Sequence, residues 1–161
     1  MLADRARACL RRLDALQNAD ESSESLQAAA QLTEIIAHGS PEAAAQADLY
    51  AMVRHYDLLR AFITGEIAER LSSFNYSFTV VDMNAFFTRY RLENPQAAAW
   101  TDATLVRLKS TLSTCLSSVG MLDSLNAGNL SPLMLDFQVE ALMRANGDAD
   151  LAAALSGMGA M

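Results

Sequence analysis

Side chains suited to contacting a polyanion are concentrated in one segment of the sequence. Residues 103–122 contain no carboxylate, and within them Arg107, Ser110 and Thr114 recur at helical spacing opposite a stripe of leucines. Lys109, the only lysine in the chain, lies on a flank of the same predicted helix. Arginine, lysine and hydroxyl side chains contact the phosphates and base edges of duplex DNA. The pattern indicates a DNA-facing helix, although an ordinary solvated surface helix can carry the same residues.

Other side chains extend this predicted nucleic-acid-binding set. Thr104 lies in the first turn of the same helix. Arg89 and Arg91 lie on opposite flanks of the preceding helix, so we expect only one of them to reach a shared phosphate-facing surface. A separate cluster of arginines stands at the start of the chain and consists of Arg5, Arg7, Arg11 and Arg12.

The sequence predicts no catalytic residue, cofactor or metal site, and therefore no enzyme. It contains no glycine-rich phosphate loop, no nucleophile elbow and no Cys/His zinc spacing. His38 and His55 each end a predicted helix, where a cation stabilises the helix dipole, so this role is favoured over a ligand role. Glu66 and Arg70 are spaced as an i,i+4 pair, which favours a solvent-facing ion pair over a carboxylate dyad.

The two cysteines, Cys9 and Cys115, are far apart in sequence, and both lie on periodic helical stretches. This placement favours small, partly buried thiols in a reducing compartment, with a disulfide or redox pair as the alternative.

Charge is distributed unevenly along the 161 residues, which carry a net charge of −7. Acidic residues outnumber basic residues in 1–79 and in 123–161, whereas residues 80–122 carry a small basic excess. The overall acidity argues against a protein that coats nucleic acid, because phosphate binding leaves a basic footprint. No apolar run approaches the roughly 18 residues that span a bilayer, and arginines occupy the place of a signal-peptide core. A cytoplasmic protein that does not enter a membrane is therefore expected.

The elements that must position these side chains are all helical, so the fold class predicted is all-α. Hydrophobic periodicity and caps predict a single domain of about eight helices. The predicted helices cover 3–17, 23–38 with Ser23 as N-cap, 41–56 after the Ser40-Pro41 cap, 57–72 with Asp57 as cap, 80–93 after a Thr79/Asp82 capping box, 102–119, 133–145 and 148–155. The helix at 57–72 carries the widest apolar surface and is expected to be the most buried.

The middle of the chain has the element order of a winged helix-turn-helix. The order is a helix at 80–93, a connection at 94–101, a helix at 102–119 and a turn-rich segment at 121–132. The last segment could form one small β-hairpin. We expect Trp100 to anchor the two helices. The domain would then divide into N-terminal helices (1–78), this unit (79–132), and C-terminal helices with a loose tail (133–161). The connection is longer than the usual tight turn.

A series of short motifs occurs in a fixed order between Tyr56 and Leu122. They are Tyr56-Asp57-Leu58-Leu59-Arg60-Ala61-Phe62, Val81-Asp82, Phe86-Phe87, Pro95, Trp100, Thr104, Leu108, Leu112, Leu116 and Val119-Gly120-Met121-Leu122. In order and spacing they resemble the BrxA family, small accessory proteins of bacteriophage-exclusion (BREX) defence systems that were once labelled inner-membrane proteins. A looser match extends the resemblance back to 5–16 and forward to Pro132.

The resemblance implies an all-helical fold with helix-turn-helix elements, double-stranded DNA as a partner, other BREX proteins as further partners, and no known enzymatic activity. Hydropathy contradicts the membrane label for this chain. Family members usually carry several dozen residues before the arginine-rich helix, and this chain begins almost at that helix. The segment is expected either to be missing from the numbered chain or to be absent from the protein.

A second function is compatible with the same sequence. The two acidic flanks and the methionines of the C-terminal part favour a helical adaptor that binds proteins within the defence complex without touching DNA. These methionines are Met134, Met143, Met158 and Met161.

Overall fold

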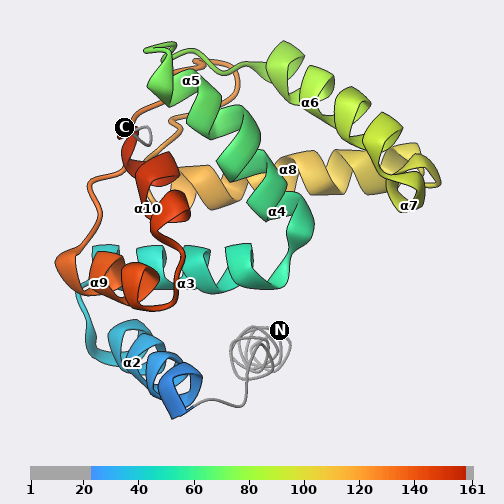
Figure 1. Cartoon of the computed structure of the whole chain (residues 1–161). Coiled ribbons are helices and arrows are strands. Elements are labelled where there is room, and N and C mark those ends of the chain that lie inside the picture. Colours follow the sequence, from blue (N-terminus) through green and yellow to red (C-terminus); the bar gives the residue numbers. More distant parts are fainter. Residues whose placement is uncertain (1–22, 159–161) are drawn as a thin grey trace.

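The computed structural model describes residues 23–158, and its regular elements are all helices (Figure 1). They are α2 (Ser23–His38), α3 (Pro41–His55), α4 (Asp57–Ala61), η1 (Phe62–Ile67), α5 (Ala68–Ser72), α6 (Val80–Glu93), α7 (Pro95–Ala98), α8 (Asp102–Ser118), α9 (Phe137–Ala145) and α10 (Ala149–Ser156). Because α4, η1 and α5 are continuous, residues 23–158 form eight helices and no strand. The predicted all-α class is confirmed. The predicted helix at 3–17, Cys9 and the arginines Arg5, Arg7, Arg11 and Arg12 lie outside the described residues.

The continuous helix α4–η1–α5 is the most buried element, as its apolar surface predicted. Phe62, Ile63 and Ile67 are fully enclosed, and α3 and α10 pack against it. Its middle is a π-helical turn, η1, which the periodicity did not predict. In Figure 1 this helix runs diagonally through the centre of the view, between α3 and α6.

Several helix starts follow the predicted capping chemistry. The Ser40 hydroxyl accepts a hydrogen bond from the backbone N–H of Ala43 at the start of α3. At the start of α6, the backbone N–H and the hydroxyl of Thr79 both donate to the Asp82 carboxylate, at 2.7 and 2.8 Å. These bonds satisfy N–H groups that have no partner within a helix, and they fix where α3 and α6 begin.

Other predicted starts were wrong. Asp57 is the first residue of α4 rather than its cap. The helix expected from residue 133 begins only at Phe137, because Asp136 caps it by accepting from the backbone N–H of Gln138. Hydrogen bonds with Gln46 and with the Leu155 carbonyl hold residues 133–136 outside the helix.

Aromatic packing fixes the connection between α6 and α8. Trp100 stacks on Tyr90 with ring centroids 5.9 Å apart and contacts Phe87 at 6.4 Å. The part of the prediction that packs Trp100 against the helix at 80–93 is confirmed. The connection itself contains α7, a short helix that the sequence interpretation treated as an irregular link.

Residues 121–131 form a closed loop instead of the predicted hairpin with strands. Isolated antiparallel bridges join Leu122 to Leu130 and Ser77 to Asn129, and they do not extend into strands within residues 23–158. The loop base is closed by the Ser131 N–H, which donates to the Met121 carbonyl at 2.7 Å. Its tip lies against the start of α6, where Gly128 has a φ of +70° and its absent Cβ would come within 3.1 Å of Thr79.

Among the described residues, none of the helices combines the length and the apolar character needed to cross a bilayer.

Candidate nucleic-acid interface

The outer side of α8 is exposed along its length, as its pattern predicted. Arg107, Ser110 and Thr114 are exposed, whereas Leu112 and Leu116 on the opposite side are buried in the core. The neighbouring helices therefore cover only the leucine stripe. The side chains predicted to face DNA lie together on one open face, which we call the α8 outer face and define by Arg107, Ser110 and Thr114.

Two side chains on this face have unused hydrogen-bonding capacity. Among the described residues, neither an ion pair nor a side-chain hydrogen bond engages the Arg107 guanidinium or the Ser110 hydroxyl. The Thr114 hydroxyl donates to the Ser110 carbonyl at 2.9 Å, which leaves its oxygen as an acceptor. Arg107 and Ser110 can thus donate to a ligand without breaking an internal bond.

Lys109 is held on the flank of α8 that faces α6. Its Nζ donates to Asn84 Oδ1 at 2.8 Å and lies 5.7 Å from the centre of the Phe87 ring. Both partners are uncharged, so neither offsets the positive charge of the ammonium group between the two helices. Sequence reasoning missed Asn84 as the residue that orients Lys109, because their contact crosses from one helix to another.

Thr104 serves the N-terminal cap of α8. Its backbone N–H donates to Thr101 Oγ1 at 3.2 Å, and the two hydroxyls lie 3.0 Å apart. The structure places Thr104 at the end of the helix, one turn before Arg107, and half-buries it.

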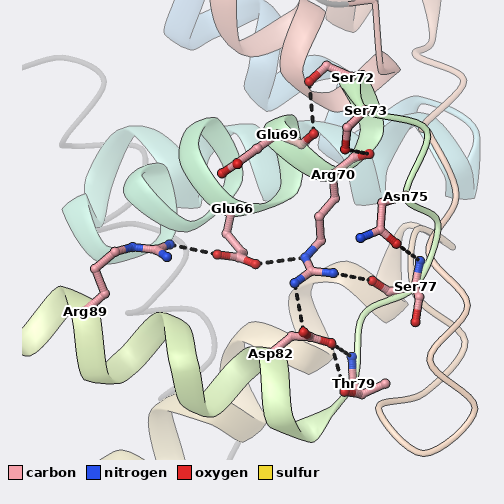
Figure 2. Close-up of polar contacts among 10 residues, drawn as sticks. All are labelled: Glu66, Glu69, Arg70, Ser72, Ser73, Asn75, Ser77, Thr79, Asp82 and Arg89. Carbon is pink, nitrogen blue, oxygen red and sulfur yellow. Dashed lines mark hydrogen bonds and ion pairs between the residues drawn. The ribbon is translucent and has the colours of Figure 1, made fainter.

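Arg89, the first of the two predicted arginines on α6, is ion-paired. Its Nη2 lies 2.8 Å from Glu66 Oε2, and this hydrogen bond raises the pKa of Arg89 above its ordinary value (Figure 2). About half of the side chain, 52%, remains exposed. Arg89 therefore points from α6 toward η1.

Arg91 braces the corner between α6 and α7. Its Nη2 donates to the Ala98 carbonyl at 3.0 Å, and its Nε is buried without a hydrogen-bond partner among the described residues. Arg91 carries no carboxylate partner there. The expectation that Arg89 and Arg91 point to different sides agrees with these different neighbours.

The pair formed by Glu66 and Arg70 is buried, in contrast to the solvent-facing pair expected from its spacing. Glu66 lies between Arg70 and Arg89, and Arg70 also contacts Asp82 at 2.9 Å and the Ser77 carbonyl at 2.6 Å (Figure 2). Partial burial opposes ionisation of Asp82, but hydrogen bonds from Thr79 and the Arg70 charge outweigh it and lower its pKa. The expectation was wrong because an i,i+4 spacing does not reveal that α6 covers this side of the central helix.

A second buried network centres on Asp148, which the sequence did not single out. The Tyr50 hydroxyl donates to Asp148 Oδ2 at 2.7 Å, and Arg54 and Arg60 both pair with the same carboxylate, at 2.9 and 3.2 Å. Burial raises the pKa of Tyr50 to about 12. We call this set the Asp148 network, and it ties α3 and α4 to the start of α10.

The two networks leave an uneven distribution of free positive charge. Arg91 on α6 and Arg107 and Lys109 on α8 have no carboxylate partner among the described residues. Every other arginine in residues 23–158 is ion-paired, and these are Arg54, Arg60, Arg70, Arg89 and Arg144. The cations without a carboxylate partner in residues 23–158 are therefore confined to α6 and α8.

One carboxylate borders the α8 outer face. Asp48 of α3 lines a hollow of about 330 Å³ together with Ser110 and Thr114 of α8. The absence of carboxylates from residues 103–122 therefore does not extend to their three-dimensional surroundings.

The described residues contain no group of three or more His, Cys, Asp or Glu side chains that could hold a metal ion. Cys115 is buried, in agreement with the expectation of a partly buried thiol. His38 and His55 are the last residues of α2 and α3, as predicted.

Comparisons with known proteins identify a family and a solved structure with a similar fold. The BrxA family model matches residues 1–147. A crystal structure of an uncharacterised protein from Magnetospirillum magneticum superposes with a TM-score of 0.71 and 20% sequence identity, over 79% of this chain and 67% of that chain. At this identity, the likeness establishes a shared fold. No curated protein matches the chain significantly.

Proposed function

The chain belongs to the BrxA family, which implies a BREX-associated protein, and we propose that it binds double-stranded DNA through the α8 outer face. In this proposal it is a non-enzymatic, cytoplasmic accessory protein that acts beside other proteins of the phage-defence system. The observation that carries the proposal is the exposed, unpaired Arg107, which stands on a helix that has no carboxylate after Asp102 and has hydroxyl groups beside it.

Local charge explains how an acidic protein can approach DNA at this surface. Apart from Arg91, the other arginines in residues 23–158 are paired with carboxylates, so they add little positive potential. Arg107 and Lys109 are not neutralised, and at physiological salt the other charges are screened beyond about 8 Å. A duplex lying on α8 would encounter a local positive region in spite of the net charge of −7.

The order of the surrounding elements supports a winged helix-turn-helix interpretation of residues 79–132. The segment 76–78 bridges to 128–130, the closed loop at 121–131 follows α8, and its tip touches the start of α6. In winged modules, the second helix enters the major groove and the wing lies along the backbone. The insertion of α7 between α6 and α8 is the departure from that plan.

The residues would have different roles in such a complex. Arg107 can donate a bidentate pair of hydrogen bonds to a guanine edge or to a phosphate, and Ser110 can donate one more. Lys109 would contact a phosphate while retaining its bond to Asn84, because an ammonium has three donors. Arg89 and Arg91 would contribute only by leaving Glu66 and the Ala98 carbonyl, so we expect smaller roles for them.

The small number of free cations limits the affinity. With two phosphates neutralised, the logarithm of the binding constant would fall with the logarithm of salt concentration with a slope of about −2. Binding is therefore expected to be weak unless further contacts or partner proteins add to it.

A titration of a fluorescent duplex tests the proposal. Replacing Arg107→Glu and Lys109→Glu together should lower the affinity at least about 100-fold, because acids would then face the phosphates. Arg144→Glu is the matched control, since it adds negative charge to an exposed site on α9, and it should change the affinity less than about twofold. Unchanged binding by the double variant refutes the placement on α8. Absence of duplex binding by the wild-type chain at low salt refutes DNA binding itself.

A further inference from the structure

The segment between the 121–131 loop and α9 is fixed to the protein through its backbone. The Leu133 N–H donates to the Leu155 carbonyl at 2.8 Å. The buried side chain of Gln46 then holds the next residues from both sides, because its Nε2 donates to the Met134 carbonyl at 2.9 Å and its Oε1 accepts from the Asp136 N–H at 2.7 Å. Hydrogen bonds at Leu133, Met134 and Asp136 therefore fix the main chain of residues 133–136 to the rest of the protein.

This anchoring holds two large apolar side chains out in solvent. Met134 is 91% exposed and Phe137 is 83% exposed, whereas Leu133 and Val139 on either side of them are buried. An exposed side chain on a mobile loop can be incidental, but here the backbone that carries both residues is tied to the core. Aromatic and methionine side chains held in this way are typical of protein-binding surfaces.

A hollow lies beside each of the two exposed side chains. Phe137 borders one of about 490 Å³ between α2 and α9, whose floor includes Ile35 and Leu142. Met134 borders another of about 550 Å³ between the start of α3 and the end of α8, whose lining includes Pro132 and Ser118. Figure 1 shows α9 lying next to α3 and above α2, and residues of these three helices line the two hollows together with the end of α8 and the segment 132–134. We call this surface the Met134–Phe137 face.

The charges on this face have one sign. Glu34 lines the first hollow and Glu42 lines the second, and both are exposed. Neither forms an ion pair with a described residue, and the described linings of both hollows lack arginine and lysine. A partner that covers this face must therefore supply apolar groups for the hollows and cations at their margins.

We propose that the Met134–Phe137 face docks an amphipathic helix of a partner protein, one with an apolar ridge bordered by lysine or arginine. The ridge would lie along the hollow between α2 and α9 and pack against Phe137, and Met134 would adapt to its side. The basic border would meet Glu34 and Glu42. The described lining of the hollow beside Phe137 includes no residue of α8, and the hollow beside Met134 reaches α8 only at its C-terminal end, at Ser118. A helix seated beside Phe137 could therefore bind while Arg107 holds DNA.

A synthetic helical peptide tests the docking surface. The probe is a fluorescein-labelled helix of about 18 residues with leucines along one side and lysines at the border, and its control replaces every lysine with glutamate. Fluorescence anisotropy with the full chain should show binding of the lysine peptide and at least about 10-fold weaker binding of the glutamate peptide. Equal binding of the two peptides would overturn the proposal.

Variants then locate the site. Phe137→Ser should weaken the lysine peptide about 10-fold or more, and Glu34→Lys with Glu42→Lys should weaken it several-fold. Leu92→Ser is the matched control, because Leu92 is equally exposed at 84% but lies on α6, and it should leave peptide binding unchanged. Equal losses for Phe137→Ser and Leu92→Ser would mean that the peptide binds elsewhere, which also overturns the proposal.

Two further measurements separate this inference from its alternatives. If sedimentation shows a wild-type dimer that Phe137→Ser dissociates, the face joins two copies of this chain and the partner-helix proposal is wrong. Duplex binding by Phe137→Ser should equal that of the wild type, because Phe137 is remote from α8. Failure of the DNA proposal and failure of the docking proposal therefore give different results.

Discussion

Arginines in this protein occur in two contrasting environments. In the Asp148 network, Arg54 and Arg60 share one buried carboxylate and fasten α10 to the central helices. On the α8 outer face, Arg107 stands exposed and makes no ion pair with a described residue. The same residue type therefore holds the fold together in one region and remains available for a ligand in the other.

This contrast shows why a count of charges does not reveal a binding surface. An arginine that already bonds to a carboxylate would have to give up that partner before it could bind a phosphate, and it would leave a buried acid uncompensated. An unpaired surface arginine gives up only water. The net charge of −7 therefore says less about DNA binding than the identity of the cations that remain unpaired.

The largest expected effect is the loss of the Asp148 carboxylate. Asp148→Ala leaves Tyr50, Arg54 and Arg60 without their shared acceptor and should lower the free energy of unfolding by about 3 kcal/mol, measured by urea denaturation. Asp150→Ala is the control, because its side chain is 66% exposed and lies 3.7 Å from Arg60, and it should cost less than about 1 kcal/mol. Similar losses for the two variants would show that the network is no more important than a surface pair.

The second effect concerns alkaline pH. Burial raises the pKa of Tyr50 from 10.0 to about 12, so between these pH values the phenol ionises in the unfolded chain and stays neutral in the folded one. The stabilisation it provides is complete below pH 10 and is lost as pH rises toward 12, by about 2 to 3 kcal/mol. Urea denaturation across this range should show a shallower decline in Tyr50→Phe. A decline as steep in the variant as in the wild type would assign the effect to other groups.

The third effect separates the two environments directly by one substitution in each. Arg107→Gln should weaken duplex binding about 10-fold and reduce the salt slope by about 1, with no change in the melting temperature. Arg89→Gln should do the opposite: binding changes little, while Glu66 loses one partner and the free energy of unfolding falls by about 1 kcal/mol. If Arg89→Gln weakens DNA binding as much as Arg107→Gln does, the distinction between paired and unpaired arginines fails for this protein.

The smallest effect is expected from a single hydroxyl. Ser110→Ala removes one free donor from the α8 outer face and should weaken duplex binding about threefold. Its stability should stay within about 0.5 kcal/mol of the wild type, because Ser110 makes no side-chain bond with described residues. An affinity unchanged within error would remove Ser110 from the interface and leave Arg107 and Lys109.

Much of the fold was predictable, because local rules determine it. The Ser40-Pro41 cap, the Thr79/Asp82 capping box and the leucine stripe of α8 all act between residues a few positions apart. Features set by distant partners were missed. They are the π turn η1, the short helix α7 and the late start of α9. Each depends on packing or hydrogen bonds with residues that are distant in sequence, as Gln46 is from the segment before α9.

At the candidate interface, too, features set within one helix were predicted and contacts between helices were not. Periodicity predicted that Arg107, Ser110 and Thr114 share one side of a helix, and that side is open. It did not reveal that Arg89 bonds to Glu66, that Lys109 rests on Asn84, or that Asp48 borders the hydroxyl groups. Each of these contacts joins two helices, and the spacing within one helix contains no information about the other.

By itself, the sequence determined the all-α class, the sides of each helix that are apolar, and the family resemblance. It could do so because hydrophobic periodicity and capping are short-range effects. Only the tertiary structure decided which charges cancel, which cations remain for a ligand, and which apolar side chains are held in solvent. Those outcomes depend on distances between helices that are remote in sequence, since electrostatic and packing energies follow proximity in space.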